Sequence, residues 1–172
     1  MINGYESLDS LIYSNPRIVD WSKLSAEPLS ENFVMRHADK LDWDVLLERN
    51  FYSLYTIMAN IHRIKNWYRV SYIYATIFTI SDLRILGHYL IWPEVFLRRV
   101  FNEDEIKELI NFVPDIWRLI SYSGRFSEDF FWDNIEKFGD KEISNMASNR
   151  SIEGWFGEGK RSAKLDVFLK LR

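Results

Sequence analysis

The chain has 172 residues, a length typical of one domain that can bury a continuous core without disulfides or structural metals. It has no cysteine, which excludes disulfide bonds and thiolate metal sites, and 16% of its residues are aromatic, enough for a packed core and a binding surface. Its net charge of −3 differs from the basic balance of most nucleic-acid-binding domains. The first residues lack the basic and apolar regions of a secretory signal, and no apolar run reaches the roughly 18 residues of a membrane span.

The charges are segregated along the chain. Residues 61–99 carry six basic and two acidic side chains, whereas residues 100–159 carry six basic and 13 acidic ones. Residues 1–60 carry five basic and nine acidic side chains, and the tail 160–172 carries five and one. This distribution predicts a positive centre between two acidic segments, followed by a basic tail.

Five tryptophans recur along the chain at intervals of 22, 24, 25 and 25 residues, namely Trp21, Trp43, Trp67, Trp92 and Trp117. Each is followed at i+3 and i+4 by apolar or small residues, the pattern of a short amphipathic helix. A fixed period in this range is typical of a repeat array. We therefore predict an all-α fold, a small α-solenoid of helix pairs with a period of about 24 residues.

A second helix is predicted to begin about ten residues after each tryptophan. Four of its N-cap candidates are Ser30, Ser53, Asn102 and Ser127. In the third repeat either Thr79 or Ser81 can cap the helix, and Thr79 keeps the better register with Asp82. An N-cap side chain accepts a backbone N–H that the helix itself leaves without a partner.

These signals divide a single domain, 1–172, into repeats over 18–40, 41–65, 66–90, 91–115 and 116–139, a degenerate repeat over 140–159 and the basic tail 160–172. Ser151, Ile152 and Trp155 supply the second half of the degenerate repeat. Terminal repeats often cap a stack, and Leu165, Phe168 and Leu169 predict a closing helix in the tail with its lysines facing acidic residues.

Small residues occupy two recurrent places. Serine follows the start of the first helix by four positions at Ser25, Ser71, Ser121 and, after Asp140, Ser144. We predict a packing role for these serines, because a small side chain lets neighbouring helices approach beside a bulky tryptophan. Gly124 and Gly139 are predicted to end helices in a left-handed conformation.

The strings from Val19 to Ser25, Leu29 to Phe33 and Phe126 to Phe131 carry a resemblance to a known class of repeats. They resemble the short D-W-x-x-L-S…L-S-E-x-F repeats found in mostly uncharacterised proteins of bacteriophages and large DNA viruses. The similarity spans roughly residues 18–138, and its period is also similar to that of leucine-rich-variant repeats. The resemblance implies a helical repeat fold and a viral origin, and it carries no catalytic residues.

No catalytic, phosphate-binding or metal motif occurs in the sequence. The three histidines, His37, His62 and His88, recur 25 and 26 residues apart. Neighbouring helices pack about 10 Å apart, too far for these side chains to share a metal ion. We therefore predict a protein without enzymatic activity, metal or cofactor, with the histidines on its surface.

The candidate binding residues are Arg63, Arg69, Arg84, His88, Arg98 and Arg99, and the aromatic residues among them include Trp67, Tyr68, Tyr72 and Tyr74. Arginine with aromatic residues suits protein interfaces and single-stranded nucleic acids alike, and the acidic pI of about 5.7 favours a protein partner. We predict a protein-binding inhibitor or adaptor that acts on a host protein in the host cytoplasm, for example a counter-defence protein of the anti-CRISPR type. The alternative is a nucleic-acid-binding accessory protein. Reversing Arg98 and Arg99 to Glu is expected to weaken binding and leave the melting temperature unchanged.

Overall fold

The computed structural model describes residues 4–15, 17–148 and 162–171. Over these residues the chain is all-α, with thirteen α-helices, two short 3-10 helices (η1 and η2) and one isolated β-bridge between Phe101 and Gly124. The predicted fold class is therefore confirmed. Contacts divide the chain into two compact units, residues 1–70 (unit 1) and 71–172 (unit 2), and a solenoid that runs through the whole chain stays a prediction.

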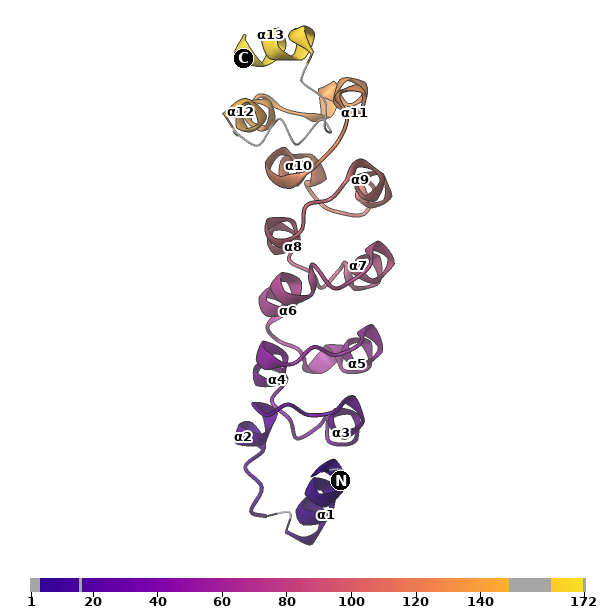
Figure 1. Cartoon of the computed structure of the whole chain (residues 1–172), viewed down its shortest axis with the longest axis vertical. Helices are drawn as coiled ribbons and strands as arrows, with labels where there is room; N and C mark the ends of the chain where they lie inside the picture. The colour runs from indigo at the N-terminus through magenta and orange to yellow at the C-terminus, as the bar shows by residue number, and fades with distance from the viewer. Residues whose placement is uncertain (1–3, 16, 149–161, 172) are drawn as a thin grey trace. The chain divides into compact units, whose positions relative to one another are not determined.

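Unit 1 consists of short helices in pairs. Its elements are α1 (Gly4–Ser14), α2 (Trp21–Ser25), α3 (Glu31–Arg36), α4 (Trp43–Arg49), α5 (Leu54–Ala59) and η1 (Ile61–Arg63), and α6 (Trp67–Tyr74) crosses into unit 2. The first helices of the pairs, α2 and α4, pack against each other, and α3 and α5 form a second row (Figure 1). The sequence analysis did not predict α1, although Leu8, Leu11 and Ile12 have helical spacing.

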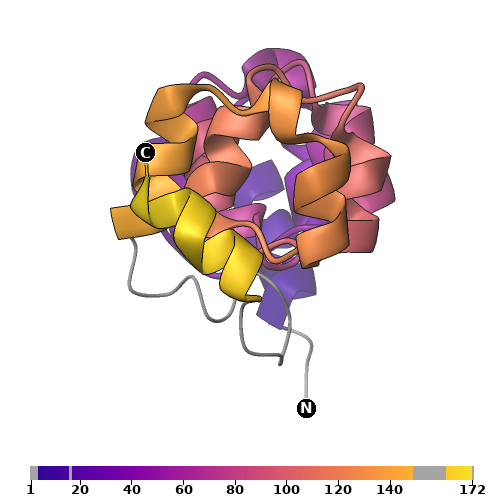
Figure 2. The ribbon, with the colours of Figure 1, turned by 90° about the horizontal axis from the view of Figure 1, so that it is seen from above.

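Unit 2 repeats the same arrangement. Its elements are α7 (Ile80–Leu86), α8 (Trp92–Arg98), α9 (Glu103–Leu109), α10 (Ile116–Ser123), α11 (Glu128–Asp133), η2 (Ile135–Lys137), α12 (Asp140–Ser148) and α13 (Ala163–Lys170). Helix α10 packs against both α8 and α12, and α7 packs against α9, so the first and second helices form separate rows (Figure 1). At the end of the unit α13 packs against α12 (Figure 2).

The tryptophans begin the first helix of each pair, as predicted. Trp21, Trp43, Trp67 and Trp92 are the first residues of α2, α4, α6 and α8, and Trp117 is the second residue of α10. Trp43 and Trp92 are only 3% and 5% exposed, whereas the other three are half-buried. The expectation that all five are mostly buried is therefore confirmed, and Trp43 and Trp92 are almost completely buried.

Three of the tryptophan rings pack against aromatic rings of their own repeat, and the predicted contact of each tryptophan with the next repeat stays a prediction. The ring pairs are Trp21 with His37 at 5.4 Å between centroids, Trp92 with Phe112 at 6.4 Å and Trp117 with Phe138 at 5.2 Å. The indole N–H groups reach backwards, since that of Trp43 donates to the Ala38 carbonyl at 2.9 Å and that of Trp92 to the Gly87 carbonyl at 3.2 Å. Each of these two indoles thus joins its helix to the end of the preceding repeat.

The second helices begin at the predicted N-caps. The side chains that accept a first-turn N–H are those of Ser30, Ser53, Thr79, Asn102 and Ser127. Thr79 and Asn102 form capping boxes, in which a carboxylate three residues later accepts the N–H of the cap itself. All five predicted caps are confirmed, and Thr79 rather than Ser81 caps the helix of the third repeat.

Two of the recurrent serines have a polar role in addition to packing. The hydroxyl oxygen of Ser25 accepts the N–H of Asp42 at 2.8 Å, and that of Ser71 accepts the N–H of Ile91 at 2.8 Å. Asp42 and Ile91 are the N-cap residues of α4 and α8, so each serine holds the start of the next first helix. Ser144 is exposed, and the packing role predicted for it is wrong.

A carboxylate on the first residue of a second helix holds the N-cap of the following second helix. The pairs are Glu31 with the N–H and hydroxyl of Ser53, Glu103 with the N–H of Ser127 at 2.8 Å, and Glu128 with the N–H of Ser162 at 3.0 Å and its hydroxyl. The last pair places α13 as the second helix that follows α11. The second helices α5, α7 and α13 begin with Leu54, Ile80 and Ala163, so this bond is confined to the three helices that begin with Glu.

The tail contains the predicted closing helix. Leu165 of α13 is fully buried, and the Phe168 ring lies 6.0 Å from Phe131 and 5.3 Å from Trp132. The ammonium of Lys164 lies 3.9 Å from the Trp132 ring centroid and contributes to the charge environment of the Glu128 carboxylate.

Parts of the predicted cap lie outside the described residues. These parts are the Leu169 side chain and residues 151–155 of the degenerate repeat.

Neither glycine that was predicted to be left-handed adopts that conformation. Gly124 ends α10 with φ −78° and ψ 154°, an extended conformation, and Gly139 also lacks a positive φ. Gly124 is required for space, because a Cβ there would lie 2.8 Å from the Cβ of Ile120. Among the described residues other than glycine, positive φ occurs at Asp115, immediately before α10.

Replacing Trp92 by Ala is expected to lower the free energy of unfolding by about 3–5 kcal/mol, the usual cost of deleting a buried aromatic side chain. Trp67→Ala is expected to cost less because Trp67 is half-buried. Urea denaturation measures both, with Tyr122→Ala as the control, since its side chain is 52% exposed and its loss should change stability by less than about 0.5 kcal/mol. Equal costs at Trp92 and Tyr122 would contradict the buried role of the indole.

Deleting residues 162–171 is expected to lower the melting temperature and promote aggregation, because the loss of α13 uncovers the Phe131 and Trp132 rings. The hydrogen bond from the Ser162 hydroxyl, against the opposing effect of burial, lowers the pKa of Glu128 from its usual value. A lowered pKa means that the ionised carboxylate stabilises the fold above its unfolded-state pKa, and that this contribution disappears as pH falls through the folded-state pKa.

Glu128→Gln should therefore reduce the acid-induced fall in melting temperature over roughly pH 6 to 3, where carboxyl groups titrate. Thermal denaturation of the wild type, this variant and the truncated chain over that range tests the role of α13. An unchanged melting temperature in the truncated chain would rule out a capping helix.

Candidate binding surfaces

The six predicted binding residues divide between the two units. Arg63 and Arg69 belong to unit 1, and Arg84, His88, Arg98 and Arg99 belong to unit 2. The side chains of Arg84, His88 and Arg98 are exposed, whereas the guanidinium of Arg99 is packed inside unit 2.

Arg99 is a structural residue of unit 2. Its guanidinium donates to the Phe78 carbonyl at 2.6 Å and the Ala75 carbonyl at 3.4 Å, and it forms an ion pair with Glu105. It also lies 5.0 Å from the Phe101 ring centroid, and the side chain is only 19% exposed. Arg99 thus ties the segment after α6 to the start of α9. The structure therefore leads us to expect that reversing the charge of Arg99 lowers the melting temperature, in contrast to the expectation from the sequence.

The other predicted residues of unit 2 are exposed. Arg98 stacks on Tyr72, with its guanidinium 4.2 Å from the ring centroid, and its charge faces solvent. Arg84 lies on α7, and His88 lies just after the end of this helix. The centroid of the His88 ring is 6.2 Å from that of Phe112. These three side chains, unlike Arg99, are accessible to a partner.

Three first helices carry a large apolar or aromatic side chain at the same position, and of these only Tyr72 was among the residues predicted from the sequence. The residue five positions after each tryptophan is Tyr72 on α6, Leu97 on α8 and Tyr122 on α10. Leu97 is 72% exposed and Tyr122 is 52% exposed. The equivalent residues of the first two repeats are Ala26 and Glu48. The third to fifth repeats therefore present large apolar groups at a position where the earlier repeats present small or charged ones.

A groove of about 460 Å³ lies within this row, between α8 and α10. Phe96 and Leu119, which are 3% and 7% exposed, belong to its buried lining, and Leu97 and Tyr122 are its exposed apolar residues. Arg118 also lines the groove and forms no ion pair with any residue that the structure describes. The groove thus combines an apolar lining with an uncommitted cation.

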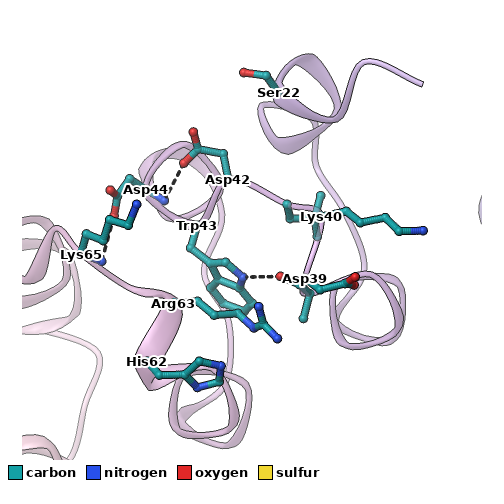
Figure 3. A pocket seen from close by; sticks show the side chains of 11 residues that line it. Ser22, Asp39, Lys40, Asp42, Trp43, Asp44, His62, Arg63 and Lys65 are labelled. Atoms are coloured by element: carbon teal, nitrogen blue, oxygen red, sulfur yellow. Dashed lines mark hydrogen bonds between the residues drawn. The ribbon is translucent and has the colours of Figure 1, made fainter. Parts of the chain in front are cut away.

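Unit 1 contains a different kind of pocket, of about 540 Å³ and mostly polar (Figure 3). The charged and aromatic residues that line it are Asp39, Lys40, Asp42, Trp43, Asp44, His62, Arg63 and Lys65. They come from the segment between α3 and α4, the start of α4, and the region of η1. The position of Arg63 in the wall of this pocket is a feature that its place in the basic segment did not predict.

Arg69, the remaining predicted residue of unit 1, is half-buried. Its Nε atom is buried without a hydrogen-bond partner among the described residues. His37 is half-buried as well, since its Nε2 lies 2.9 Å from the Asp9 carboxylate of α1, whereas His62 and His88 are exposed as predicted.

No protein-family model, curated protein or solved structure matches this chain. The resemblance to viral repeats therefore stays a prediction. No helix in the described ranges is both long and apolar enough to cross a membrane. Within the same ranges no group of three or more His, Asp or Glu side chains is arranged to hold a metal ion.

Arg98 and Arg99 form a matched pair for a stability test. Arg99→Met is expected to lower the free energy of unfolding by about 1.5–3 kcal/mol, because it removes charge-assisted hydrogen bonds to two carbonyls and a carboxylate. Arg98→Met should cost less than about 1 kcal/mol, the value of an exposed cation–π contact. Urea denaturation of the two variants measures the difference, and similar costs would contradict the distinction between a structural and an exposed arginine.

Proposed function

We propose that this chain is a non-enzymatic protein-binding module whose docking surface is the row formed by the half-buried Tyr72 and the exposed Leu97 and Tyr122. The observation that carries the proposal is the apolar groove between α8 and α10 with arginines beside it. Exposed apolar patches on a stable scaffold are typical of interaction sites. Leu97 and Tyr122 remain exposed although each helix buries its inner face, so the fold does not account for them.

The partner that fits this surface is an amphipathic helix with apolar side chains flanked by carboxylates. A groove between two packed helices can receive the apolar face of a third helix. An aliphatic or aromatic anchor would contact Phe96 and Leu119, while Arg98 and Arg118 would attract acidic residues beside the anchor. The charge complementarity would increase the association rate and select against basic helices.

The biological role proposed for this binding is inhibition or recruitment of a host protein in the host cytoplasm, as in a counter-defence protein. The support is the resemblance of the strings Val19 to Ser25 and Phe126 to Phe131 to viral repeats. This step is an analogy, and it is separate from the argument for the docking surface. The net charge of −3 favours a protein over a nucleic acid as the partner.

A displayed library of four-turn amphipathic helices, varied in apolar anchors and in acidic or basic flanks, tests the proposed surface. Selection on the wild-type protein is expected to enrich helices with Leu or Phe anchors and acidic flanks. The enriched helices should lose binding to the double variant Leu97→Asp/Tyr122→Ser and bind more slowly to Arg98→Glu/Arg118→Glu. Ile85→Asp on α7, a change at a residue that is 53% exposed in the other row of unit 2, is the matched control and should bind like the wild type.

Circular dichroism shows whether each variant folds. Enriched helices that bind the double variant as tightly as the wild type would place the interface elsewhere. Stronger binding of single-stranded oligonucleotides than of any helix, with a steep logarithmic salt dependence, would replace the proposal by nucleic-acid binding.

A further inference from the structure

The polar pocket of unit 1 has an imbalance between its hydrogen-bond donors and acceptors. Two of its three carboxylates, those of Asp42 and Asp44, accept backbone N–H groups through one oxygen each, and Asp39 accepts none among the described residues. The Asp42 carboxylate accepts the N–H groups of Asp44 and Val45, at 3.1 and 3.3 Å. The Asp44 carboxylate accepts the N–H groups of Lys65 and Asn66, at 3.3 and 2.9 Å. These two carboxylates cap α4 and anchor the segment before α6, and this role accounts for them.

The donors of the pocket are less satisfied. The Nε atom of Arg63 is buried and has no hydrogen-bond partner among the described residues. A buried donor without an acceptor is unfavourable, and most buried polar groups are paired. His62 and Lys65 extend from neighbouring positions, both exposed. Lys40 also lines the pocket, but its ammonium lies over the Trp21 ring, 5.1 Å from the centroid.

The shape of the pocket presents the guanidinium to a ligand. Arg63, Trp43, Asp39 and His62 line the pocket together, as labelled in Figure 3. The indole N–H is already donated to Ala38, so the ring forms an apolar wall. Asp39 makes no ion pair with Arg63, and because Nε is buried while the side chain as a whole is half-buried, an external acceptor would bind the terminal Nη groups.

We infer that this pocket binds an oxyanion, a carboxylate or phosphate group, with Arg63 as the main ligand and His62 and Lys65 at its edge. A guanidinium offers a planar set of N–H donors that match two oxygens of either group. The site lies wholly within unit 1, and the inference is independent of the protein-binding surface proposed for unit 2. A cation is disfavoured because Arg63 carries the charge of the same sign and both Asp42 and Asp44 are engaged by backbone N–H groups.

Nuclear magnetic resonance of the arginine Nε–Hε groups tests the site in the full chain. Inorganic phosphate, acetate and chloride are titrated at matched ionic strength. Phosphate, acetate or both are expected to shift the Arg63 resonance in a saturable way, with a dissociation constant of about 1–10 mM, the range for a few charged hydrogen bonds. Chloride should produce only a small, unsaturated drift.

Two variants show whether the guanidinium is responsible. Arg63→Met keeps most of the aliphatic stem, and backbone amide shifts that saturate with phosphate or acetate in the wild type should be lost in it. Arg84→Met removes an exposed arginine from unit 2 and should retain them. Arg63→Lys keeps the positive charge but loses the planar set of guanidinium N–H donors, and it is expected to weaken binding roughly tenfold.

The separate titrations with phosphate and acetate distinguish a phosphoryl ligand from a carboxylate ligand. Saturation by phosphate alone identifies a phosphoryl group, and saturation by both anions, or by acetate alone, identifies a site that accepts a carboxylate. Either result supports an oxyanion site. The inference is overturned if neither anion saturates beyond the chloride control, or if Arg63→Met, shown to be folded by its amide spectrum, binds like the wild type.

Discussion

The fold depends on side-chain oxygens that accept the backbone N–H groups at the starts of its short helices. The regular helices of the central repeats are five to eight residues long, so unpaired N–H groups form a large share of each helix. Helices of this length are not stable alone in water. Caps within a repeat, such as Ser30, accept some of these unpaired N–H groups. Ser25 and Glu31 add bonds from one repeat to the next, so that capping and stacking are one interaction.

This arrangement separates the residues that build the fold from those available for binding. The inner faces of the helices carry the caps and the buried apolar side chains, and position five after the tryptophan stays outside. It can therefore hold Glu48 in one repeat and Leu97 in another without a change in the helix pair. A surface of this kind acquires a function through substitutions at equivalent positions of several repeats. In unit 2 those substitutions are apolar, which supports a protein partner over a small-molecule substrate.

The arginines show how one residue type serves different purposes in the same scaffold. Arg99 completes the fold because backbone carbonyls and Glu105 surround its guanidinium. Arg98, the next residue back along α8, stacks on Tyr72 and keeps its charge in solvent. Arg63 lines a pocket in which two of the three carboxylates already accept backbone N–H groups. The basic segment is therefore not one site, and its positive charge alone says little about which arginine meets a ligand.

The sequence by itself determined the features that depend on neighbours a few residues apart. The tryptophan spacing, the caps at Ser30 and Thr79, and the closing helix with Leu165 could all be predicted, because N-caps and amphipathic stripes are local patterns. Only the tertiary structure decided which groups meet across repeats. The Asp42 N–H donates to the Ser25 hydroxyl of the preceding repeat. The guanidinium of Arg99 donates to the Phe78 carbonyl, which lies about one repeat earlier in the chain. Charge and periodicity do not specify such contacts, since they depend on how each helix is rotated and seated against the next.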